Sequence, residues 1–245
     1  MTRRTGHAAT IVSALVLLAT GTACEAATPR DPVAKEIPEA EREVLIAALR
    51  RAISAMPAPT PPYGKAPDDS TLEADRRCFW DPGAKRWTAP ARATSERLFH
   101  LDGADLPSLE YRVYLNHEPE LPEDLASAGG APRQFPLPGT VAVEVTLIGA
   151  DAGGGRVALP ISPEDAATAL TVIRIYVGSR EMESAVRALL AGGQLAGSIF
   201  PAVRKAGEVH SIVVDFYGPK RTVEGLAPAL DVAGLRKVLS ASQKK

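Results

Sequence analysis

The sequence predicts an α+β protein with a mostly antiparallel, twisted sheet and helices packed on one face of it. Two patterns predict this class. Segments such as 109–116 and 141–148 alternate apolar and polar residues, as strands do when only one face of their sheet is buried. Other segments carry apolar residues every three or four positions and begin at helix-capping residues such as Ser179 and Asp231. With 45% hydrophobic and 23% charged residues, the chain also has the composition of a protein with a packed core.

The first 27 residues have the organisation of a secretory signal peptide. Arg3 and Arg4 precede an uncharged apolar run over 8–19, and small residues surround Cys24. A helix that crosses a bilayer needs about 20 apolar residues, so this run is too short for a permanent transmembrane segment. We therefore expect an exported bacterial protein that works in the periplasm or at the outer surface of the cell envelope.

The segment Gly21-Thr22-Ala23-Cys24 resembles the lipobox of bacterial lipoproteins, although Gly21 stands where a lipobox usually has Leu. The resemblance implies that Cys24 is lipidated and becomes the first residue after cleavage. Several acyl chains would then anchor the protein to a membrane. The alternative is ordinary cleavage near Ala26 or Ala27, which would discard Cys24 and release a soluble secreted protein.

The leader is followed by a helix, a proline-rich stretch and a longer mixed region. Residues 38–56 are expected to form an amphipathic helix, because apolar residues recur on one helical face. Residues 57–69 are rich in proline, which cannot continue a helix, and they are expected to form a linker or draped loop. The expected organisation is a signal peptide (1–27), an N-terminal helix with its linker (28–69) and a single α+β domain (70–245).

A β-hairpin is predicted next, from two aromatic segments on either side of a turn. Residues 78–80 (Cys-Phe-Trp) and 86–88 (Arg-Trp-Thr) flank residues 81–85, which begin with the turn-forming sequence Asp-Pro-Gly. In such a hairpin Trp80 and Trp87 would form a cross-strand pair.

This hairpin is the candidate ligand-binding site of the sequence. Trp80 and Trp87 would offer an aromatic platform for a glycan or peptide, with Arg76, Arg77 and Arg86 supplying cation–π or carboxylate contacts. The predicted ligand-binding residues are Trp80, Trp87, Arg76 and Arg86. The alternative is a small aromatic cluster that seals one end of the core.

The rest of the chain alternates strands and helices. After the two alternating strands, a glycine-rich loop joins strand to strand and opens no helix, which argues against a phosphate-binding loop. The expected elements are a loop over 149–155, a strand over 156–161, a helix over 162–170, a strand over 171–177, a helix after Ser179, a strand over 209–217 and a last helix capped by Asp231.

Known catalytic and cofactor motifs are missing from the sequence. It contains no His-Glu-x-x-His, Gly-x-Ser-x-Gly, Gly-x-x-x-x-Gly-Lys-Ser/Thr or Cys-x-x-Cys sequence, so no cofactor is predicted. A net charge of -1 over 245 residues argues against nucleic acid as a partner, since phosphate binding needs clustered basic residues. His117 is followed by acidic residues and is a candidate metal ligand, but no second histidine stands at a ligand spacing. A solvated acidic loop is the simpler interpretation, and no metal site is predicted.

These observations lead to the expectation of an exported, non-enzymatic binding or accessory lipoprotein whose partner is an envelope protein or glycan. The alternative is an envelope hydrolase. Cys78 follows two arginines, which lower a thiol's pKa, and a distant histidine, His210 or His100, would serve as its base.

Overall fold

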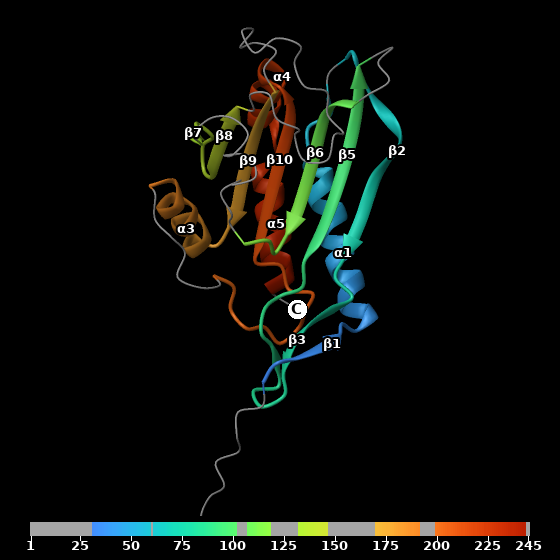
Figure 1. Cartoon of the computed structure of the whole chain (residues 1–245), viewed down its shortest axis with the longest axis vertical. Coiled ribbons are helices and arrows are strands. Elements are labelled where there is room, and N and C mark those ends of the chain that lie inside the picture. The colour runs from blue at the N-terminus through green and yellow to red at the C-terminus, as the bar shows by residue number, and fades with distance from the viewer. Residues whose placement is uncertain are drawn as a thin grey trace, which may run out of the picture.

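The computed structural model describes residues 31–59, 61–101, 107–118, 132–146, 170–191 and 199–243. These residues form two sheets and several helices (Figure 1). The elements in chain order are β1 (Val33–Glu36), α1 (Glu39–Ser54), β2 (Tyr63–Ala74), β3 (Arg77–Asp81), β4 (Arg86–Trp87), β5 (Ala93–Leu101), β6 (Pro107–Leu115), β7 (Arg133–Phe135), β8 (Val141–Thr146), β9 (Leu170–Gly178), α3 (Arg180–Leu190), β10 (Ser211–Pro219), α4 (Lys220–Leu226), a short 3-10 helix (Ala227–Ala229) and α5 (Val232–Gln243).

The larger sheet has seven strands in the order β2-β5-β6-β10-β9-β8-β7, and every neighbouring pair is antiparallel. The predicted α+β class with a mostly antiparallel sheet is therefore confirmed. Strand β10 lies at the centre, between β6 and β9, and is buried along almost its whole length. Antiparallel strands buried on both faces read as continuous apolar runs, which is the pattern of Ile212 to Tyr217 apart from Asp215.

Helices α1, α4 and α5 cover one face of this sheet. Figure 1 shows α1 and α5 behind the strands. Their buried apolar residues, such as Leu49 and Leu235, join one core cluster with Ile175, Val214 and Val223 of α4. Helix α3 packs in addition on the opposite face, over β8 and β9.

The smaller sheet has three strands in the order β1-β3-β4. Figure 1 shows β1 and β3 at one end of the molecule, with α4 at the other end. A β-bridge links the small sheet to the segment before β10. In this bridge the backbone groups of Trp87 and Val203 exchange two hydrogen bonds, at 2.8 and 3.0 Å.

The linker predicted over 57–69 is shorter than expected, because β2 begins at Tyr63 and crosses the boundary drawn at residue 70. Edge strands tolerate proline where no ladder donor is needed. Pro67 falls inside the register shift between Lys65 and Ser70, so the β2–β5 ladder does not use its missing N–H. The prolines of 57–69 therefore predicted a linker where the chain in fact forms part of an edge strand.

Several predicted elements are confirmed with small differences in their ends. The helix predicted over 38–56 is α1, and the strand predicted over 171–177 is β9. Ser179 caps α3 by accepting a hydrogen bond from the backbone N–H of Met182, and Asp231 accepts one from Gly234 at the start of α5. The leader with Cys24, the glycine-rich loop, the strand over 156–161 and the helix predicted to start at Ser162 lie outside the described residues.

Candidate functional site

A row of charged side chains crosses the seven-stranded sheet on the face opposite to α1 and α5. Strand register aligns Glu96 of β5, Arg112 of β6, Asp215 of β10 and Arg174 of β9. The signs alternate along this charge row, so each charge has an opposite charge directly across from it. The charge row crosses the central strands of the sheet, whose other side chains are mostly apolar.

The pair at the centre of the charge row, Arg174 and Asp215, is largely buried and well aligned. The guanidinium of Arg174 donates to both carboxylate oxygens of Asp215, from Nε at 2.8 Å and from Nη2 at 2.7 Å. Asp215 is fully buried and also accepts a hydrogen bond of 3.2 Å from the Tyr217 hydroxyl. Bidentate pairing of this kind supplies both charge neutralisation and a fixed side-chain geometry.

The other arginine of the row lies between two carboxyl groups. Arg112 donates from Nε to Glu110 and lies 3.5 Å from Glu96 through Nη2, with its guanidinium over the Tyr217 ring at 4.5 Å. Glu110 is fully buried. Burial, with the neighbouring Glu96 carboxyl as a further cause, raises the pKa of Glu110 to about 8. Glu110 is therefore largely protonated at neutral pH.

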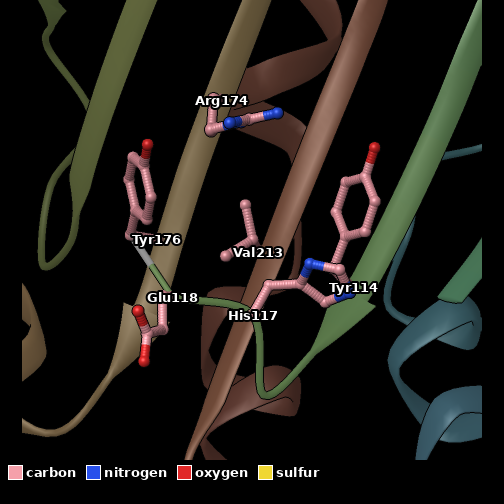
Figure 2. A pocket seen from close by; sticks show the side chains of 6 residues that line it. All are labelled: Tyr114, His117, Glu118, Arg174, Tyr176 and Val213. Carbon is pink, nitrogen blue, oxygen red and sulfur yellow. The ribbon is translucent and has the colours of Figure 1, made fainter. Parts of the chain in front are cut away.

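A cavity of about 160 Å³ opens beside this row. Figure 2 shows Arg174 and Tyr176 projecting from β9, Val213 from β10 and Tyr114 from β6. His117 and Glu118 come from the segment that follows β6, and they complete the lining. The His117 ring lies 4.9 Å from the Tyr114 ring, measured between centroids, so the two rings form one side of the cavity.

Two of the groups around this cavity, His117 and Tyr114, are better suited to hydrogen bonding than to acid–base catalysis. Burial lowers the pKa of His117 to about 4, so its ring is neutral and weakly basic at neutral pH. Burial raises the pKa of Tyr114 to about 12, which keeps its hydroxyl protonated. An efficient general acid or base has a pKa near the working pH, and neither group meets that condition. Pockets for drug-sized ligands measure about 300–1,000 Å³, so this cavity fits only a small polar molecule.

The tryptophans predicted to bind a ligand form the expected cross-strand pair. Trp80 of β3 faces Trp87 of β4, with ring centroids 5.1 Å apart in an edge-to-face arrangement. The ammonium of Lys35 lies over the Trp80 ring at 4.3 Å. Trp87 is 2% exposed and belongs to the main core cluster, whereas Trp80 is half-buried at its edge. This burial fits the alternative reading of the sequence, in which the aromatic cluster seals one end of the core.

The structure does not bring the predicted arginines together with both tryptophans in one open site. Arg76 and Arg86 are exposed, and Arg76 lies in the short connection between β2 and β3. The exposed aromatic residue of this region is Phe79, which points away from Trp80 because successive residues of a strand face opposite sides. The alternation of residues 77–80 in the sequence is enough to predict that Phe79 and Trp80 face opposite sides of the strand.

The candidate nucleophile Cys78 has the environment of an inert thiol. Its Sγ donates to the backbone oxygen of Ala89 at 3.4 Å. Burial raises the pKa of the thiol above its ordinary value, which disfavours the thiolate. His100 lies on β5 and His210 directly before β10, with its Nε2 3.5 Å from Glu208. In the described part of the chain, no three His, Cys, Asp or Glu side chains gather as metal ligands.

The charge row is a feature that the sequence analysis missed. Arg174 and Asp215 are single charges inside otherwise apolar strands, and buried charges require partners. That contrast is the signal that marks both residues. Their pairing depends on the strand register, which the order of residues along the chain does not reveal.

The raised pKa of Glu110 predicts a specific pH dependence of stability. A carboxyl whose pKa rises on folding from 4.5 to about 8 stabilises the folded state at low pH, and this stabilisation is lost as the pH rises through 8. His117, whose pKa falls from 6.5 to about 4, acts in the opposite sense but only below pH 6.5. Between pH 6.5 and 8 we therefore expect Glu110 to lower the free energy of unfolding by about 1–2 kcal/mol.

Urea unfolding at pH 6.5 and 8 measures this effect, with Glu110→Gln as the comparison. The glutamine keeps the shape of the protonated acid and cannot ionise, so its stability should be nearly constant over this interval. Equal losses in the native and variant proteins would contradict the assignment.

No protein-family model, curated protein or solved structure matches this chain. Among the described residues, no helix is both long enough and apolar enough to cross a bilayer.

Proposed function

We propose that this protein is an exported, non-enzymatic binding or accessory lipoprotein of the bacterial envelope, held at a membrane through an acylated Cys24. The observation that carries the proposal is the leader, in which a basic segment, a short apolar run and small residues lead to that cysteine. Lipidation there would leave the folded protein outside the cytoplasm and attached by its N-terminus.

The cavity beside the charge row supports a binding role for the sheet face. Its polar lining combines an arginine, a glutamate, two tyrosines and a neutral histidine around a space of about 160 Å³. Such groups orient a small polar group by hydrogen bonds. A partner that presents one polar side chain or one sugar hydroxyl group to this cavity would match both its size and its chemistry.

The chemistry of Cys78 gives little support to the hydrolase alternative. A cysteine nucleophile acts as its thiolate and is activated by a nearby base or positive charge. Burial raises the pKa of Cys78, and its Sγ donates a hydrogen bond to a backbone oxygen. Arg76 and Arg77, the two positive charges that precede it, are both exposed.

Intact mass of the mature protein, measured before and after alkylation, tests both parts of this proposal. From the membrane fraction of an exporting bacterial host we expect a chain that begins at Cys24 and carries acyl groups. Iodoacetamide at pH 7 should modify Cys78 at least about tenfold more slowly in the folded protein than after denaturation, because the partly buried thiol is shielded and its pKa is raised.

Two results would contradict the proposal, one concerning the membrane anchor and the other the non-enzymatic role. A mass that begins near Ala26 or Ala27 would show an unanchored secreted protein. Rapid alkylation of folded Cys78 with a pH midpoint near neutrality would show an activated thiolate and would favour the hydrolase.

A further inference from the structure

The three-stranded sheet has an outer face that carries an exposed aromatic residue between two arginines. Alternation along β3 directs Cys78 and Trp80 towards the core and Arg77 and Phe79 to the other side. Register places Ala34 of β1 opposite Phe79. We call this surface, with Arg86 of β4 at its other end, the outer face of the small sheet.

Phe79 is unusually open for a large apolar side chain. It is 58% exposed, more than Val44 on α1 at 45% or Leu72 on β2 at 39%. An aromatic side chain held open on a rigid strand is suited to insertion into a partner surface.

The surroundings of Phe79 are more basic than the chain as a whole, whose net charge is -1. Register places an acid opposite each arginine of the outer face, with Glu36 opposite Arg77 and Asp81 opposite Arg86. Glu36 lies 3.4 Å from Arg77, and Asp81 accepts hydrogen bonds from the backbone N–H groups of Gly83 and Ala84. Arg76 and Lys85, in the connections before and after β3, are further exposed basic residues beside this face, whereas Lys35 lies over the Trp80 ring on the other side of the sheet.

The covalent distance to Cys24 places this sheet close to the proposed anchor. Val33, the first residue of β1, follows Cys24 by nine positions. A fully extended chain spans at most about 3.3–3.6 Å per residue, so β1 lies within about 30 Å of an acylated Cys24. Figure 1 shows β1 and β3 at the end of the molecule away from α4, so a tether at Cys24 would hold this end nearer to the membrane than the α4 end.

We propose that the outer face of the small sheet docks on an anionic lipid surface, with Phe79 inserted among the lipid headgroups and Arg77 and Arg86 against the phosphates. Juxtamembrane basic residues are attracted to anionic lipid within a Debye length of about 10 Å. This orientation rests on the proposed tether at Cys24. An acidic protein would offer similar charges, but the short connection to the anchor favours the membrane itself.

Vesicle sedimentation of an unacylated protein tests the docking separately from the tether. The Cys24→Ala chain is exported, recovered after removal of its leader and mixed with vesicles of phosphatidylcholine, alone or with phosphatidylglycerol. We expect several-fold stronger binding to the phosphatidylglycerol vesicles, and weaker binding at high salt. Phe79→Ser should weaken this binding about 5–10-fold, and Arg77→Glu combined with Arg86→Glu at least about tenfold.

Val44→Ser and Arg187→Glu are matched controls. Val44 is an exposed apolar residue on α1 and Arg187 an exposed basic residue on α3, so both changes should leave vesicle binding unaltered. Far-UV circular dichroism confirms that each variant is folded. The proposal would be overturned if all variants bound vesicles equally well, or if the parent protein bound neither type of vesicle.

A photoreactive side chain at position 79 of the native-anchored protein identifies what the outer face contacts in the envelope. An adduct with lipid supports the docking, whereas an adduct with a protein, or no adduct, overturns it. Acyl groups on Cys24 together with no vesicle binding would support the proposed tether and contradict the proposed docking. Vesicle binding without acylation would leave the docking and remove the tether.

Discussion

Replacing Asp215 by alanine is expected to lower the free energy of unfolding by about 3–5 kcal/mol, because it leaves the largely buried guanidinium of Arg174 without its counter-ion. The change removes two charge-assisted hydrogen bonds, at 2.8 and 2.7 Å, and the acceptor of the Tyr217 hydroxyl. Chemical denaturation monitored by circular dichroism measures the loss.

Two controls separate burial from charge pairing. Glu39→Gln removes an ion pair with Arg42 at the same 2.7 Å distance but on the exposed surface of α1, and its loss should be much smaller. The double variant Arg174→Met with Asp215→Leu should recover most of the stability lost in Asp215→Ala, since it leaves no unpaired charge. A loss below about 1 kcal/mol for Asp215→Ala would contradict the buried pair.

Replacing Trp87 by alanine should cost about 3–5 kcal/mol, the usual range for removing a large aromatic side chain from a core. Trp87 is 2% exposed and meets the edge of Trp80, and its backbone joins the small sheet to Val203. Loss of its ring would open a cavity where the two parts of the structure meet. Thermal and urea unfolding would show the loss, and Trp87→Phe should restore part of it.

Phe79→Ala is the matched aromatic control on the same small sheet. Because Phe79 is 58% exposed, its removal should change the free energy of unfolding by no more than about 0.5 kcal/mol. Similar losses at positions 79 and 87 would show that Trp87 is not a core residue. Unchanged stability of Trp87→Ala with lost glycan or peptide binding would instead favour the aromatic platform predicted from the sequence.

Local patterns predicted those elements whose signal lies within a few residues. The amphipathic repeat gave α1, the turn sequence after Trp80 gave the β3–β4 hairpin, and Ser179 marked the start of α3. Each of these features depends on interactions between residues close together in the sequence, so the local sequence is enough to predict it.

The elements that sequence reasoning missed depend on distant neighbours. Strand β2 follows a run of prolines and carries polar residues, and it is held as an edge strand by β5. Strand β5 itself has no simple alternation, because Arg97 shares the side of Phe99 while Leu98 points the other way. Tertiary pairing overrides weak local preference in both strands.

The candidate site on the sheet could be foreseen only in part. Arg174 and Asp215 stand out as lone charges in apolar strands, and His117 was noticed at the end of the strand that became β6. Their convergence at one cavity requires β10 to lie between β6 and β9, an order that no local pattern specifies.

The central place of β10 also sets an order of events in folding. Leu115 of β6 pairs with Ile212 of β10, and Val177 of β9 pairs with the same residue from the other side. The middle of the sheet therefore closes only after the C-terminal part of the chain has joined the rest, and contacts so distant in sequence make folding slow. During synthesis the sheet therefore lacks its central strand until residues 211–219 are available, and until then β6 and β9 have no partner strand between them.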